Sequence, residues 1–161
     1  MSKAPTSERT GARGRRVFVG LGSNVEDARE RLTAALGGLR VAGFRVAAVA
    51  RPVRSPYEAL DGSRVEGAAA VLDAVAELRT EQSPEAVLAV LQRLEAEAGR
   101  DRSGGVLRTL DLDLLDAGVE RAGADLVLPH PRALGRAFVL APWEEIAPHH
   151  VVTGTGRSVL E

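Results

Sequence analysis

Two aspartates separated by a single leucine are the residues of this chain that point most clearly to chemistry. Asp111 and Asp113 alternate with leucines over residues 110–114. Alternation is the period of a β-strand, so both carboxylates stand on one face while the leucines enter a core. Neighbouring carboxylates repel and aspartate is disfavoured in strands, so the pattern predicts a compensating cation. Spacing alone leaves a second interpretation open, an edge strand whose aspartates are solvated.

Three arginines precede this segment and supply groups that bind phosphate. Arg100, Arg102 and Arg108 lie in a glycine-containing stretch. A guanidinium binds phosphate oxygens bidentately and neutralises charge that develops during transfer. Lys3 is the only lysine, so an anion within the fold must be bound by arginine. A magnesium ion takes one or two carboxylates and leaves positions for phosphate oxygens, so the two clusters indicate a phosphate-plus-metal site. The alternative is an arginine-rich surface loop.

A histidine between two prolines forms a third cluster. His130 is followed closely by Arg136 and Phe138. The prolines restrict the backbone on both sides, so the imidazole is held in place and could donate a hydrogen bond to a phosphate oxygen. A tight turn with an exposed histidine, followed by a core phenylalanine, is the alternative.

Composition narrows the classes of protein. The chain has 161 residues, a net charge of −1 and no cysteine. The length predicts one domain, residues 16–161, after a disordered polar tail over residues 1–15. Near-neutral charge argues against general binding of nucleic acid or membrane, and the absence of cysteine excludes disulfides and thiol catalysis. No apolar run reaches membrane-spanning length. We therefore expect a cytoplasmic protein with small-molecule partners, either a monomer or a weak homodimer.

The order of predicted elements indicates a fold class. A strand over residues 17–21 leads into a helix that begins near the capping-box spacing of Ser23 and Glu26 and ends at Gly37 and Gly38. The other predicted elements are strands over 44–53, 71–78 and 110–115, a helix from Ser83 to Gly99, and short strands over 126–128 and 138–140. Strand, helix, strand, strand, helix, strand is the split βαβ order of an α+β, ferredoxin-like α/β sandwich, here with additional short strands and a C-terminal extension. Its helices cover one sheet face and leave the other for a ligand.

Three segments together resemble a known family. They are residues 20–24 (Gly-Leu-Gly-Ser-Asn), residues 108–113 (Arg-Thr-Leu-Asp-Leu-Asp), and Pro-His-Pro at 129–131 followed by Arg-Ala-Phe-Val-Leu at 136–140. Their order and approximate spacing are similar to those of the 6-hydroxymethyl-7,8-dihydropterin pyrophosphokinases of folate biosynthesis, over about residues 17–148. The resemblance implies ATP as co-substrate, transfer of its terminal pyrophosphate to a hydroxymethyl group, and release of AMP.

The resemblance also implies roles for individual residues. It makes Asp111 and Asp113 the ligands of two Mg²⁺ ions and, together with Arg100 and Arg102, the catalytic residues. The implied ATP-binding residues are Gln92, Glu95, Arg108, His130 and Arg136. The implied acceptor-binding residues are Gly22, Ser55, Pro56, Val71, Asp73 and Phe138.

The acceptor side departs from the family pattern. Val71 and Asp73 stand where family members have an aromatic residue and an asparagine, and the stretch before Arg108 lacks the usual tryptophan. An ionised aspartate only accepts hydrogen bonds. Asp73 therefore favours an acceptor substrate whose edge is rich in hydrogen-bond donors. These departures leave two hypotheses open. One is a pyrophosphokinase acting on the pterin or a related alcohol, and the other is a paralogue that binds nucleotide without catalysis.

Overall fold

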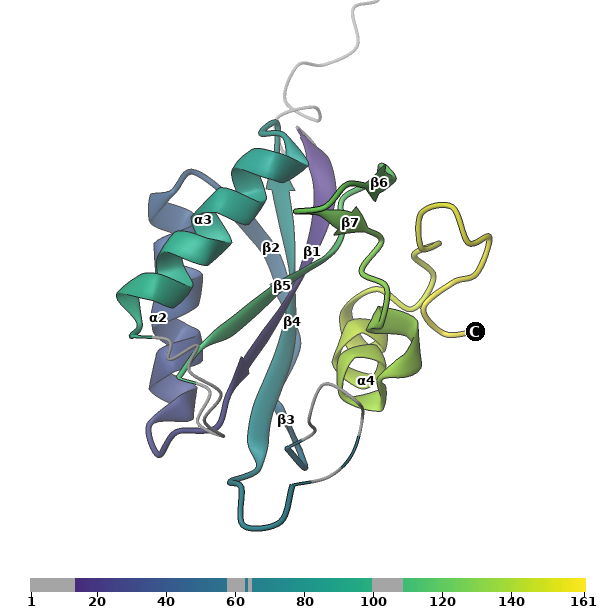
Figure 1. The fold of residues 1–161 in the computed structure, drawn as a ribbon. Helices are drawn as coiled ribbons and strands as arrows, with labels where there is room; N and C mark the ends of the chain where they lie inside the picture. Colours follow the sequence, from purple (N-terminus) through teal and green to yellow (C-terminus); the bar gives the residue numbers. More distant parts are fainter. Residues whose placement is uncertain (1–13, 58–62, 64, 100–108) are drawn as a thin grey trace, which may run out of the picture.

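The computed structural model describes residues 14–57, 63, 65–99 and 109–161, and within them an antiparallel sheet forms the centre of the molecule (Figure 1). The strands are β1 (Arg15–Ser23), β2 (Arg45–Val49), β3 (Val53–Ser55), β4 (Val71–Thr80) and β5 (Asp111–Asp116). The strand order along the main path of the sheet is β2-β4-β1-β5. Strand β3 pairs with the first three residues of β4, Val71–Asp73. Helix α2 (Ala28–Val41) joins β1 to β2, and α3 (Pro84–Glu97) joins β4 to β5. This order confirms the predicted ferredoxin-like α+β class.

Helices α2 and α3 cover one face of the sheet and enclose the larger core. Their buried residues recur at helical spacing, and the leucines of β5 meet them from the sheet. The predicted end of α2 at Gly37 and Gly38 is wrong, because the helix continues to Val41. A Cβ atom on Gly38 would lie 2.6 Å from Cδ2 of Leu94 in α3, so this glycine permits close approach of the two helices.

Helix α4 (Ala137–Ile146) and the C-terminal segment lie on the opposite face and cover one end of it (Figure 1). They enclose a second core that contains Phe18, Val75, Leu115 and Trp143. The strand predicted over residues 138–140 is wrong, because these residues belong to α4. A short apolar run cannot distinguish strand from helix by itself, and here the buried residues Val139, Pro142 and Trp143 follow helical spacing.

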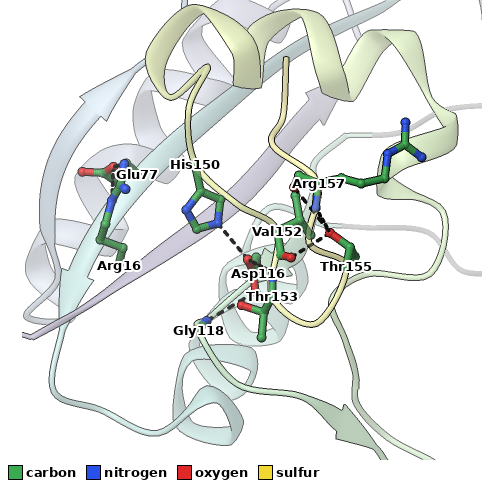
Figure 2. A network of polar contacts seen from close by, with 9 residues as sticks. All are labelled: Arg16, Glu77, Asp116, Gly118, His150, Val152, Thr153, Thr155 and Arg157. Atoms are coloured by element: carbon green, nitrogen blue, oxygen red, sulfur yellow. Dashed lines mark hydrogen bonds and ion pairs between the residues drawn. The ribbon is translucent and has the colours of Figure 1, made fainter. Parts of the chain in front are cut away.

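A β-bulge in β5 connects the sheet to the C-terminal segment. Phe18 pairs with Asp116 and Val19 with Leu114, so Leu115 is an extra residue and both Leu115 and Asp116 face the second core. Asp116 is fully buried, and its Oδ2 accepts a hydrogen bond from the backbone N–H of Thr153 (3.0 Å). Figure 2 shows the imidazole of His150 directed at the same oxygen, 2.8 Å away.

The remaining elements are small. A hairpin of β6 (Arg121–Ala122) and β7 (Val127–Leu128) follows β5, and a 3₁₀ turn over Ala133–Gly135 precedes α4. Of the helices in the described residues, none is both long and apolar enough to span a membrane. Residues 1–13 of the predicted tail lie outside the described residues.

Candidate active site

The strand register places three carboxylates on one sheet face. Gly22 of β1 lies opposite Asp73 of β4 on one side and opposite Asp111 of β5 on the other, and Gly20 lies opposite Asp113. Directly opposed residues of antiparallel strands project to the same face, so Asp73, Asp111 and Asp113 share the face that carries α4. They lie beyond the bulge, at the end of this face away from the buried Asp116.

Asp111 and Asp113 keep access to solvent while the backbone between them is fixed. Both are half-buried, and the side chain of Asp113 is 46% exposed. The N–H of Leu112 donates to Oε2 of Glu95 (3.2 Å), a glutamate of α3 that is only 4% exposed. Glu95 therefore holds the outer edge of β5 from the helix side of the sheet. The sequence predicted a nucleotide-binding role for Glu95 and did not predict this contact.

The two carboxylates fit magnesium chemistry better than that of a metal bound by protein alone. No group of three or more potential metal-ligating side chains occurs among the residues that the structure describes. Magnesium requires few protein ligands, because water and phosphate oxygens fill most of its coordination positions. Paired, solvent-accessible aspartates on one sheet face suit such an ion.

His130 approaches Asp113 from the segment after β7. The N–H of His130 donates to the carbonyl of Leu115 (2.8 Å), which joins this segment to β5. Nδ1 accepts a hydrogen bond from the N–H of Arg132 (3.2 Å), so in this assignment Nε2 carries the ring proton. Nε2 lies 4.0 Å from Oδ1 of Asp113. Burial lowers the pKa of His130, and Arg136 and Arg132 act in the same direction, whereas Asp113 opposes them.

Arg136 and Phe138 stand together at the start of α4. The guanidinium carbon of Arg136 lies 5.4 Å from the centre of the Phe138 ring, within the range of a cation–π contact. Both side chains are half-buried, and Phe138 packs against the edge of the second core. The ring is thus partly accessible and is held beside a positive charge.

Asp73 is the most buried of the three carboxylates on this face. It is 7% exposed, and the hydroxyl of Ser55 in β3 donates to its Oδ2 at 2.5 Å. The pKa of Asp73 is raised to about 7, mainly by burial and also by the charges of Asp111 and Asp113, while Ser55 and Arg136 oppose the rise. A carboxyl group perturbed by burial beside other carboxylates is a marker of a functional site.

The other predicted acceptor residues surround Asp73 or line a pocket. A Cβ atom on Gly22 would lie 3.2 Å from Oδ1 of Asp73 and 3.4 Å from Cγ1 of Val71, so glycine leaves both uncovered. A pocket of about 510 Å³ is lined by Ser55, the exposed Pro56 and Tyr57, together with residues from the stretch 65–70. The ring of Tyr57 is buried at 7% exposure and forms part of that wall.

Some predicted site residues are not brought together by the described structure. Arg100, Arg102 and Arg108 lie outside the described residues. Gln92 is exposed on α3, a helix that covers the sheet face opposite to the one that carries the aspartates. Its expected contact with nucleotide stays a prediction.

Two buried polar residues, Ser23 and Asn24, hold the end of β1 through contacts that the sequence did not predict. The hydroxyl of Ser23 donates to the carbonyl of Thr109 (2.7 Å), directly before β5, and Nδ2 of Asn24 donates to the carbonyl of Ala69 (3.3 Å). The predicted capping box is therefore wrong, since α2 begins at Ala28 and Asp27 makes no side-chain cap. Small polar residues after a glycine in a turn were the available signal for backbone bracing.

Fold and site together define a class of protein. One face of a ferredoxin-like sheet carries paired carboxylates, and a histidine from the segment after β7 approaches one of them. An arginine beside a half-buried aromatic ring stands at the start of α4, and a pocket lies next to β3. Such a face suits an enzyme that transfers a phosphate-containing group with the help of magnesium.

Comparison with known proteins assigns the family within that class. Residues 18–148 match the family model described as 7,8-dihydro-6-hydroxymethylpterin-pyrophosphokinase (HPPK). The chain is 37% identical over 144 residues to the 2-amino-4-hydroxy-6-hydroxymethyldihydropteridine pyrophosphokinase of Methylorubrum extorquens, which covers 86% of this chain and 87% of the relative. It is 38% identical to the enzyme of the same name from Pseudomonas aeruginosa over 83% of this chain and 81% of the relative. It is 36% identical to the enzyme of the same name from Bacillus subtilis over 80% of this chain and 76% of the relative. The chain belongs to the HPPK family.

Proposed function

We propose that this chain transfers the terminal pyrophosphate of ATP to the hydroxymethyl group of 6-hydroxymethyl-7,8-dihydropterin and releases AMP. Membership of the family supports the reaction, because the relatives are named for it. The observation that carries the proposal is the placement of Asp111 and Asp113 on one accessible face with Nε2 of His130 4.0 Å from Asp113.

Asp111 and Asp113 are the proposed ligands of two magnesium ions that arrive with ATP. When bound, these ions supply charge neutralisation along the triphosphate. The proposed role of His130 is to donate a hydrogen bond from Nε2–H to a phosphate oxygen beside Asp113, and the lowered pKa favours the neutral ring that this role uses. Arg136 adds a positive charge at the same end of the face. By family likeness, Arg100, Arg102 and Arg108 bind the phosphates, and Gln92 and Glu95 lie near the nucleotide.

The proposed step is a single displacement. The hydroxymethyl oxygen attacks the β-phosphorus, the bond from that phosphorus to the oxygen of the α-phosphate breaks, and AMP leaves with the bonding electrons. The hydroxyl proton passes to water. Transfers of this kind require mainly orientation and charge neutralisation, so no covalent enzyme intermediate is needed.

Incubation with ATP, magnesium and the hydroxymethyl dihydropterin, followed by mass spectrometry of the products, tests the proposal. The expected products are AMP and a diphosphate ester of the pterin in equal amounts. ADP as the nucleotide product would contradict pyrophosphoryl transfer. Tight ATP binding with no product from any hydroxymethyl heterocycle would instead favour a nucleotide-binding paralogue without catalysis.

A further inference from the structure

We propose that His150 and Asp116 are positioning residues, which fix the bulge of β5 and thereby set where His130 stands in the active site. The inference rests on the proposed function for the role of His130 at the phosphates. It goes beyond that function by adding two residues that act through the backbone of β5 and touch no reacting group. The segment after α4 thereby becomes part of the catalytic unit.

The hydrogen bonds of Asp116 join β5 to the segment after α4. Its Oδ2 lies 2.8 Å from Nε2 of His150 and accepts from the N–H of Thr153 at 3.0 Å, as Figure 2 shows. Burial raises the pKa of Asp116, but the hydrogen bonds outweigh burial and hold the pKa below its ordinary value. The group is therefore a carboxylate at neutral pH, and because a carboxylate only accepts, His150 donates from Nε2. Hydrogen bonds to an ionised group are among the strong ones, so this end of β5 is firmly held.

The bulge connects Asp116 to the backbone of His130. Leu115 is the extra residue of β5, and its carbonyl accepts the N–H of His130 at 2.8 Å. The residue that holds His130 is therefore the bulged residue itself, directly before Asp116 in the chain. Bulges re-aim neighbouring groups and are common next to active sites. A displacement of Asp116 would move the carbonyl to which His130 is bonded.

The ring of His150 is fixed by packing as well as by its hydrogen bond. Its centre lies 4.5 Å from that of Phe18 in β1 and 6.0 Å from that of Trp143 in α4. The side chain is only 14% exposed. His150 thus contacts β1 and α4 while it bonds to β5, so three elements determine the position of Asp116. Groups locked in this way by packing and hydrogen bonds can hold a site to the precision that catalysis requires.

Both groups at the phosphate end of the site depend on the shape of β5. Asp113 belongs to the strand, and His130 is bonded to it through Leu115. The distance of 4.0 Å between Nε2 of His130 and Oδ1 of Asp113 is therefore set by the few residues that include the bulge. A displacement of about 1 Å at a reacting centre can cost about 10²-fold in rate. Loss of the His150 bond should accordingly lower kcat, although no group that touches substrate is removed.

The test compares two substitutions at one position. His150→Leu keeps an apolar side chain against Phe18 but has no donor, whereas His150→Gln places an amide N–H at a reach similar to that of Nε2. For His150→Leu we expect kcat to fall by about 10–100-fold and KM for the acceptor to stay within about twofold of wild type. His150→Gln should recover most of the lost kcat, because it restores the donor to Asp116.

Two controls separate positioning from stability. Val159→Ala removes packing from the same segment at a residue that is 4% exposed in the second core, and it leaves the bonds of Asp116 in place. It should lower the melting temperature and leave kcat near wild type. Asp125→Asn, at an exposed aspartate of the β6–β7 hairpin, should change neither. If melting curves show that His150→Leu does not fold, His150→Asn replaces it, because its shorter amide cannot reach Asp116.

Hydrogen exchange measured by NMR tests the inference without turnover. In the variant that lacks the donor, the amide of His130 should exchange at least about 10-fold faster relative to the amides of β4, and His150→Gln and Val159→Ala should show no such change. This result would support the inference even if the wild-type chain formed no AMP, whereas missing AMP would contradict the proposed function. Exchange at His130 that rose only in step with β4 would overturn the inference. So would an unchanged kcat without the donor, or an equal fall of kcat in Val159→Ala.

Discussion

Asp73 and Asp111 lie opposite the same residue, Gly22, one on each side of β1. The row would link the two halves of the proposed reaction, because Asp111 is a proposed metal ligand and Asp73 a proposed acceptor-binding residue. The glycine between them keeps the face open, and each carboxylate raises the electrostatic cost of the other. A ligand that brings both magnesium and N–H donors would relieve both charges.

Replacement of either metal-side aspartate should abolish turnover and leave the fold intact. For Asp111→Ala and Asp113→Ala we expect kcat to fall by roughly 10³-fold or more, because several kcal/mol of charge stabilisation are lost with the metal. Neither side chain belongs to a core, and removal of one of two like charges relieves repulsion. Steady-state kinetics and thermal melting check the two statements, with Asp125→Ala as control. Unfolding of either variant would show that the pair is structural.

Asp73→Asn should stabilise the protein at high pH and not at low pH. The folded-state pKa of about 7 exceeds the ordinary value of 3.8, so folding becomes less favourable as pH rises from about 4 to about 7. Asparagine removes this penalty, and we expect a gain of roughly 2 kcal/mol at pH 8 that disappears below pH 4. Urea unfolding at several pH values, with a metal chelator present, measures the difference in free energy of unfolding between this variant and the wild-type chain. A gain that did not depend on pH would have another origin.

The Asp116 network should stabilise the fold above pH 4 and weaken in acid. Burial raises the pKa of Asp116, but hydrogen bonds from His150 and from the N–H groups of Thr153 and Gly118 outweigh burial and hold the pKa below its ordinary value. A lowered carboxylate pKa adds stability that is complete above the unfolded value of 3.8 and is lost as pH falls through the folded value.

Asp116→Asn tests this network. The amide group would face donors at a fully buried position, so we expect a loss of roughly 3 kcal/mol at pH 7. The loss should shrink as the pH is lowered below 4. An equal loss at all pH values would point to packing instead of charge, and the exposed Asp125→Asn should show neither effect.

Two adjacent glycines of α2 offer a matched pair. Both are helical, but a Cβ atom on Gly37 meets nothing within 4 Å, whereas one on Gly38 meets Leu94 at 2.6 Å. Gly37→Ala should therefore raise stability by about 0.5–1 kcal/mol through helix propensity alone. Gly38→Ala should gain nothing or lose stability, since Leu94 must move. Chemical denaturation measures the free energy of unfolding of both variants. Equal gains in stability would mean that α2 and α3 do not approach each other closely at Gly38.

The predictable part of this molecule is its local pattern. Alternation placed Asp111 and Asp113 on one face and their leucines in the core, and the helix opened by Ser83 and Pro84 begins as predicted, with Ser83 accepting from the N–H of Ala86. The predicted start and end of α2 were wrong because contacts with residues distant in sequence determine the roles of Ser23 and Gly38. Ser23 bonds to Thr109, 86 positions away, instead of capping a helix, and Gly38 serves the approach of another helix.

The bulge in β5 shows the same limit. Strict alternation would turn Asp116 into the core beneath α3, but one extra residue brings it to the other face, where His150 lies 34 positions further along the chain. The raised pKa of Asp73 likewise depends on its burial in the sheet and on the charges of Asp111 and Asp113, which belong to another strand. Such convergence is a property of topology, and a single sequence without its fold does not display it.

The central claim is that a pyrophosphoryl group moves as one unit from ATP to the hydroxymethyl acceptor. ATP carrying a ³²P label at the β-phosphorus tests it most directly, in a reaction with magnesium and 6-hydroxymethyl-7,8-dihydropterin separated by chromatography. We expect the β label to appear in the pterin ester at the rate at which unlabelled AMP forms, and we expect Asp113→Ala to prevent both. Label that remained in ADP while the pterin gained a single phosphate would contradict it.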